Sequence, residues 1–158
     1  MSGRSGARLA RLAGLSTLAD AFELWNVLDR FPGAEARGDA FPLAEAREAI
    51  RASESALRGR RVVLLGGSVA AAVRWRGAPL EWGVIEKTAW TPERGLELVA
   101  RYDVALLPHP SGLNHWWNDP ENEAAASRFL KEEVRRWQRQ SKVTSSAQIR
   151  SSTRETAS

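Results

Sequence analysis

A histidine held between two prolines is the feature of this sequence that most directly suggests chemistry. The short apolar run 104–107 predicts a buried parallel strand, and Pro108, His109 and Pro110 follow it directly. Because each proline fixes its own φ, the imidazole is presented on a stiff loop. Open α/β sheets bind ligands at the carboxyl ends of their strands. A histidine there can donate a hydrogen bond to charge that develops on a substrate oxygen, so we predict that His109 is a functional group.

The loop that carries this histidine resembles a known motif. Residues 109–113, His-Pro-Ser-Gly-Leu, resemble the His-Pro-Ser loop of the uracil-DNA glycosylase superfamily. The resemblance implies that His109 is catalytic and hydrogen-bonds the uracil carbonyl oxygen as the glycosidic bond breaks. It also implies that Ser111 and Gly112 bind the substrate by pinching its phosphate backbone. Leu113 would wedge into the base stack, and we expect Asn114 to contact the DNA beside it. The alternative is a proline-rich loop with a surface histidine.

Three further segments are similar to the same superfamily, in its order and spacing. They are residues 3–9 (Gly-Arg-Ser-Gly-Ala-Arg-Leu), 24–27 (Leu-Trp-Asn-Val) and 63–70, which contains Leu-Gly-x-x-Val-Ala, so the resemblance covers about residues 3–135. It implies that Arg4, Ser5 and Gly66 contact DNA and that Asn26 recognises the uracil edge. An amide suits that role because it can donate to one edge atom and accept from the neighbouring imide N–H. The alternative for Asn26 is a strand-end asparagine that caps a turn.

The first motif of the superfamily has no counterpart in this sequence. That motif is a Gly-Gln-Asp-Pro or Gly-Glu-Ala-Pro-Gly loop, whose acid or amide positions the attacking water. Residues 1–15 contain no Asp or Glu, and Met1 stands almost where the loop would already have ended. We therefore expect uracil excision by the 158-residue chain to be very slow or undetectable. Either the start is internal to a longer reading frame, or the protein is a shortened member of the superfamily.

Composition narrows the class of protein. The chain has 158 residues, of which 43% are hydrophobic, as expected for one domain with its own core. The absence of cysteine excludes disulfides, thiolate zinc sites and iron–sulfur clusters. No run has transmembrane length and no signal-peptide core follows Met1, so we expect a cytoplasmic protein. We also expect a monomer, and the glycosylase resemblance implies that no metal or cofactor is needed. The net charge of +4 suits a polyanionic partner. The resemblance implies that this partner is uracil-containing DNA, duplex or single-stranded.

Strand-like and helix-like segments alternate along the chain. This pattern predicts an α/β fold, a three-layer sandwich with a central, mostly parallel sheet, over residues 1–140. Residues 141–158, rich in Ser, Thr and Arg, predict a disordered basic tail. The expected helices cover residues 7–15, 16–23, 42–57 and 69–75, with further helix starts at 91–93 and 119–121; the expected strands cover 24–28, 61–65, 82–85 and 104–107.

Three functions compete at this point. The first is a DNA glycosylase, and the second is a non-catalytic DNA- or protein-binding module on the same fold. The third is a nucleotide-binding domain built around the glycine turn at residues 66–68, although the Gly-x-Gly-x-x-Gly pattern and the Walker lysine are missing. The glycosylase hypothesis predicts that Asn26, Gly66 and His109 converge at one sheet edge. It also predicts salt-sensitive DNA binding, to which the arginines at positions 4, 8 and 11 contribute.

Overall fold

The computed structural model describes residues 4–29, 34–35, 38–39, 41–111 and 114–155, with side chains through residue 140 except those at 34–39. The chain divides into two compact units. One contains residues 25–116 and the other contains residues 1–24 together with 117–158. Within the described part of the chain, no helix is both long enough and apolar enough to cross a membrane.

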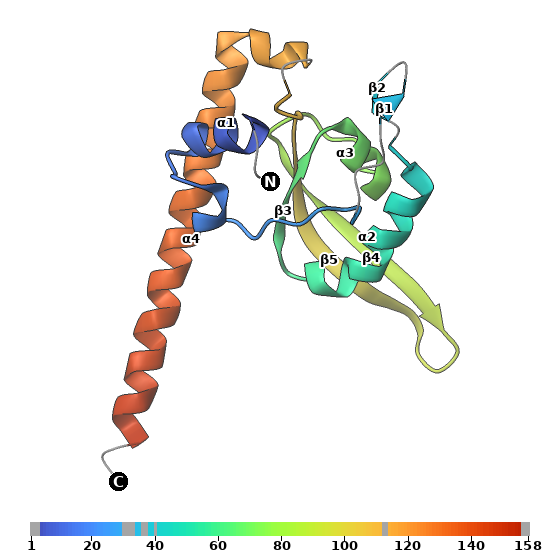
Figure 1. Ribbon diagram of the computed structural model, residues 1–158. Coiled ribbons are helices and arrows are strands. Elements are labelled where there is room, and N and C mark those ends of the chain that lie inside the picture. The colour runs from blue at the N-terminus through green and yellow to red at the C-terminus, as the bar shows by residue number, and fades with distance from the viewer. Residues whose placement is uncertain (1–3, 30–33, 36–37, 40, 112–113, 156–158) are drawn as a thin grey trace. The chain divides into compact units, whose positions relative to one another are not determined.

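A three-stranded sheet organises the unit of residues 25–116 (Figure 1). β5 (Gly95–Leu107) lies in the middle, parallel to β3 (Arg61–Leu65) and antiparallel to β4 (Trp82–Thr91). The expectation of a mostly parallel sheet is therefore wrong for the described strands, which form one parallel and one antiparallel pair. The reason is the short turn at residues 92–94, because strands joined so closely can pair only as an antiparallel hairpin.

The hairpin also corrects the helix start expected at residues 91–93. Thr91 ends β4 and pairs with Gly95, which adopts φ +74°. This positive φ is easy for glycine and costly for other residues, so Gly95 allows the chain to reverse immediately after Pro92. A second, minor hairpin is formed by β1 (Ala34–Glu35) and β2 (Gly38–Asp39).

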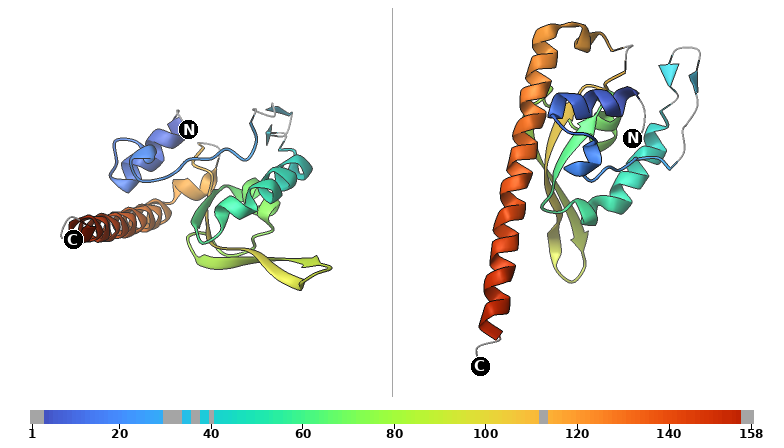
Figure 2. Two further views of the ribbon diagram at one scale, coloured as in Figure 1. Left: turned by 90° about the horizontal axis from the view of Figure 1, so that it is seen from below. Right: turned by 60° about the vertical axis from the view of Figure 1, so that its left-hand side comes forward.

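Two helices pack on one face of the sheet, as Figure 2 shows. They are α2 (Leu43–Leu57) and α3 (Gly67–Val73), and both agree closely with the helices expected from the sequence. Their apolar residues meet buried residues of all three strands in one cluster: Ala46, Ile50, Ala70, Ala72 and Val73 from the helices, and Leu64, Ile85, Ala100, Tyr102 and Val104 from the strands. This packing supplies two layers of an α/β fold, and the third layer of the expected sandwich stays a prediction.

The strand expected at residues 24–28 is absent from the structure. Residues 22–26 have no regular secondary structure and residues 27–29 form a bend. Val27 and Leu28 instead pack against the core cluster. Their apolar character, which the sequence pattern attributes to strand pairing, is explained by this packing, because burial can override a strand propensity.

The other unit is helical. It is formed by α1 (Arg4–Ala13), a short 3-10 helix η1 (Leu18–Asp20) capped by Thr17, and α4 (Pro120–Glu155). Leu9 and Leu12 of α1 and Leu130 of α4 are buried, and the Ser127 hydroxyl on α4 donates a 2.8 Å hydrogen bond to the Leu12 carbonyl. The one-turn 3-10 helix η2 (His115–Asn118) precedes α4.

Helix α4 begins at an N-cap, as the sequence predicts. The Asp119 carboxylate accepts a 2.8 Å hydrogen bond from the Glu121 N–H, as expected for an N-cap. The helix then runs to Glu155. The disordered tail expected over residues 141–158 stays a prediction. Because no glycine or proline follows Pro120, extension of an already nucleated helix costs little at each further residue.

Candidate functional site

His109 stands two residues beyond the carboxyl end of β5. Pro108 and Pro110 are buried, whereas the His109 side chain is exposed between them. The loop is thus anchored on both sides of the imidazole by packing as well as by the fixed φ of proline. This arrangement confirms the expectation of a stiff loop that presents a histidine at a strand end.

Gly66 brings the turn between β3 and α3 against this loop. Its N–H donates a 2.9 Å hydrogen bond to the Leu107 carbonyl, and its φ is +93°. A Cβ placed on Gly66 would lie only 3.0 Å from the His109 Cβ, closer than ordinary van der Waals contact. Gly66 and His109 therefore converge at one sheet edge as predicted. The positive φ and the close approach explain the glycine, which weakens the nucleotide-binding hypothesis for this turn.

Asn114 closes the loop that begins at His109. Its side-chain amide donates to the His109 carbonyl (3.1 Å), and its side-chain oxygen accepts from the Trp116 N–H (3.1 Å). The Asn114 N–H also donates to the Ser111 carbonyl at 3.1 Å. Sequence analysis assigned Asn114 to DNA contact and missed this bracing role, which is typical of asparagine in turns.

Four further residues of the predicted site also belong to this unit. Ser111 is half-buried, and Gly112 and Leu113 lie outside the described residues. Asn26 is exposed in the irregular segment that Val27 and Leu28 anchor to the core. Its approach to His109 and its role in recognising uracil stay predictions.

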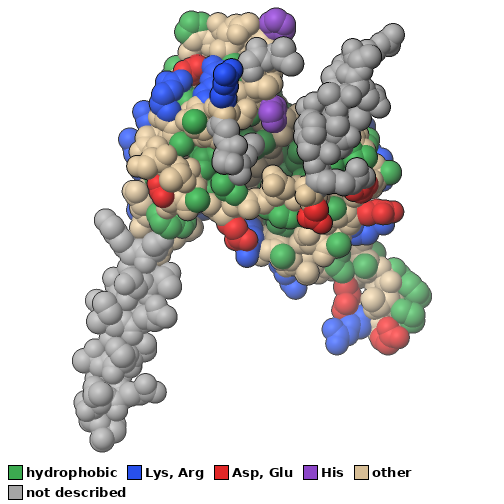
Figure 3. Space-filling model, in the orientation of Figure 1, with side chains coloured by type: hydrophobic (Ala, Val, Ile, Leu, Met, Phe, Trp, Pro, Cys, Tyr) green, Lys and Arg blue, Asp and Glu red, His purple; other side chains and the backbone are tan. Residues whose placement is uncertain are grey.

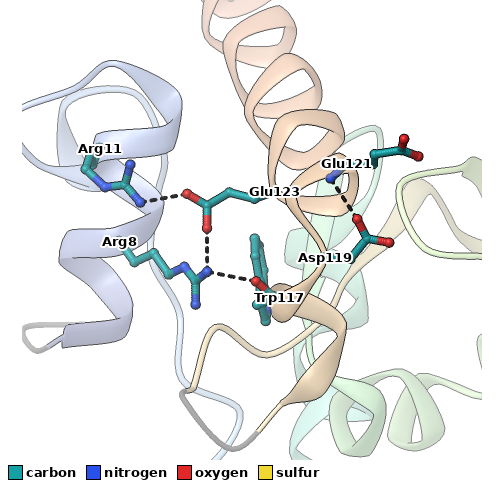
Figure 4. Close-up of polar contacts among 6 residues, drawn as sticks. All are labelled: Arg8, Arg11, Trp117, Asp119, Glu121 and Glu123. Carbon is teal, nitrogen blue, oxygen red and sulfur yellow. Dashed lines mark hydrogen bonds and ion pairs between the residues drawn. The ribbon is translucent and has the colours of Figure 1, made fainter.

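In the helical unit, a glutamate gathers two of the arginines expected to contact phosphate. Glu123 on α4 accepts hydrogen bonds from Arg8 and, at 2.9 Å, from Arg11 (Figure 4). Arg8 also stacks over the ring of Trp117 at 4.7 Å and donates to the Trp117 carbonyl at 3.4 Å. The two hydrogen bonds hold the pKa of Glu123 below its ordinary value.

These contacts give Arg8 and Trp117 a structural role. Trp117 is only 4% exposed, so it belongs to the core of its unit rather than to a base-stacking surface. Arg4 is exposed and Ser5 is half-buried on α1, and Figure 3 shows Lys and Arg side chains gathered over this helix. The predicted contacts of Arg4 and Ser5 with DNA stay untested.

The described residues contain no group of three or more His, Asp or Glu side chains placed to hold a metal ion. At the sheet edge, the His109 imidazole can act as a hydrogen-bond donor and acceptor.

Comparison with known protein families gives a match to one of them. The family model described as the uracil DNA glycosylase superfamily matches residues 1–138, which span the sheet, the His109 loop and the first half of α4. Neither the search of curated proteins nor the search of solved structures gave a match.

Proposed function

The chain belongs to the uracil DNA glycosylase superfamily, and from this premise we propose that it binds DNA and acts on the N-glycosidic bond of uracil through His109. The family match indicates a DNA glycosylase-like role. The observation that carries the finer proposal is the exposed His109 between two buried prolines, packed against Gly66 at the carboxyl edge of the sheet.

The proposed reaction breaks the bond between uracil N1 and the deoxyribose C1′. A uracil flipped out of the base stack leaves with the bonding electron pair, and negative charge grows on its carbonyl oxygen. A His109 N–H donates a hydrogen bond to that oxygen, which stabilises the leaving anion. Water then adds to C1′ and loses a proton to solvent, and Asn26 is the proposed reader of the uracil edge. Residues 1–15 offer no carboxylate to orient this water, so we expect slow turnover.

Two exposed histidines allow a matched test of this proposal. Uracil excision from an oligonucleotide is measured with the 158-residue chain in excess, for wild type, His109→Ala and His115→Ala. We expect His109→Ala to lower the single-turnover rate by about 10²–10³, as for loss of one preorganised donor, and His115→Ala to retain it. Detectable and equal rates for wild type and His109→Ala would contradict the assignment.

The non-catalytic binding module is the second candidate, and the lack of a carboxylate within residues 1–15 favours it. The same oligonucleotides separate the two functions. DNA binding without excision, even when a family-like water-positioning segment precedes Arg4, would support the module. Recovery of excision by that segment, and its loss in His109→Ala, would support the glycosylase.

A further inference from the structure

The segment that connects α3 to β4 returns to the sheet edge that carries His109. Pro79 forms a parallel bridge with Leu106, and the Leu80 N–H donates a 2.8 Å hydrogen bond to the Leu106 carbonyl. On its other side, Leu106 pairs with Leu64 of β3. The last residues of β5, and the His109 loop that follows them, thus emerge between the β3–α3 turn on one flank and residues 78–81 on the other.

This second flank is rigid. The ring of Trp75 lies directly against the backbone of Gly77 and of Gly83 on β4, since a Cβ on either glycine would overlap the indole. Arg74 and Leu80 adopt φ values of 63° and 65°, which are unfavourable for residues with a side chain. Such backbone persists only where the surrounding packing enforces it. The backbone of the segment between α3 and β4 is therefore held in one conformation beside the sheet.

Two arginines of this segment, Arg74 and Arg76, are exposed. Neither guanidinium group makes a hydrogen bond, ion pair or ring contact with any residue that the structure describes. By contrast, Arg94 and Arg101 on the β4–β5 hairpin pair with Glu97 and Glu86, at 3.5 Å and 3.4 Å. A guanidinium on a rigid segment without an internal carboxylate partner gives up no ion pair when it binds a phosphate, and it can donate two parallel hydrogen bonds.

The position of these arginines fits a nucleic-acid backbone beside His109. Pro79 bridges to Leu106, and Leu106 lies three residues before His109. Arg76 in turn lies three residues before Pro79, so at most roughly 11 Å of chain separates these two residues. Arg74 follows α3, whose seven residues span about 10 Å from the Gly66 turn. Both guanidinium groups are thus attached within a few nucleotide spacings of the imidazole.

We propose that Arg74 and Arg76 bind phosphates of the DNA strand on the flank of His109 opposite to Gly66. This inference rests on the proposed DNA binding and assigns to it a contact surface that the superfamily motifs do not include. A competing explanation is that Arg74 only compensates the partial negative charge at the carboxyl end of α3. That explanation predicts a loss of stability without a loss of DNA affinity.

Two double variants that lower the net charge by the same amount test the proposal. Arg74→Asn with Arg76→Gln removes the proposed contacts, and asparagine is chosen because it tolerates positive φ. The control, Arg94→Gln with Arg101→Gln, removes two exposed, ion-paired arginines from the hairpin. Affinity for a uracil-containing oligonucleotide is measured by fluorescence anisotropy at several salt concentrations. We expect the first variant to bind at least about tenfold more weakly and its slope of log K against log salt to shrink by about 1.4–1.8, with little change in the control.

The outcomes separate this inference from the proposed function. Wild-type binding with equal affinities and salt slopes for the two double variants would overturn the inference and leave the proposed function standing. Absence of wild-type DNA binding would overturn both. Should the first variant lose thermal stability, Arg74→Lys with Arg76→Lys keeps the charge, and its salt slope must return to the wild-type value if the contact is electrostatic.

Discussion

Replacement of Gly83 by alanine should destabilise this protein more than a typical glycine-to-alanine change in a strand. A Cβ on Gly83 would overlap the Trp75 Cη2 atom and lie 2.8 Å from Cζ3, whereas ordinary contact begins near 3.4 Å. The same ring meets Gly77 at its Cζ2 and Cε2 atoms, so it is confined at both glycines. Overpacking of this kind costs about 1–3 kcal/mol. We expect a loss near the upper end of that range, which lowers Tm by roughly 4–12 °C in a chain of this length.

Urea denaturation followed by circular dichroism measures this loss. Gly67→Ala is the matched control, because no atom lies within 4 Å of its added Cβ and the residue is helical. That change should stabilise the protein by about 0.5–1 kcal/mol. In a Trp75→Phe background, the penalty for Gly83→Ala should shrink, since the smaller ring leaves room for the methyl group. Unchanged stability of Gly83→Ala, or an equal penalty in both backgrounds, would refute the argument.

Three further changes can be followed by the same measurement. The Tyr102 hydroxyl is buried without a partner among the described residues, so Tyr102→Phe should be neutral or stabilise by up to about 1 kcal/mol. Burial, with a smaller effect of Glu54, raises the pKa of Tyr102 to about 12. Between pH 10 and 12 the unfolded chain therefore loses the phenolic proton while the folded chain keeps it. The free energy of unfolding of wild type should fall by about 1.4 kcal/mol per pH unit in this range, relative to Tyr102→Phe. Because Arg8 and Arg11 lower the pKa of Glu123, its contribution is present above pH 4.5 and is lost as the pH falls through the lowered value. Glu123→Gln should therefore be less stable than wild type at pH 7, by at most about 1 kcal/mol, and the difference should close in acid. Asp119→Ala removes the cap of α4 and should cost about 1 kcal/mol, whereas no loss would show that the cap contributes nothing.

Neighbouring residues in the sequence were sufficient to predict those elements that are stabilised by contacts between neighbours in the chain. The helix at residues 43–57, the strand at 61–65 and the Asp119 cap appear where the pattern predicts them. The stiff His109 loop is of the same kind, because the constraint comes from the two prolines beside it. Each of these features depends on residues that are close together in the chain, so a short stretch of sequence is enough to predict it.

Tertiary structure decided the features whose partners are far apart in the chain. The expected strand at 24–28 became an irregular segment because Val27 and Leu28 pack on the core, and the long β4–β5 hairpin replaced an expected helix start. Glu123 pairs with Arg8 across 115 positions, which no local pattern records. The contact of Gly66 with His109 and the return of Pro79 to Leu106 likewise arise from packing across the sheet. Sequence alone thus predicted the histidine and its loop, and the folded chain determined which backbone segments lie beside them.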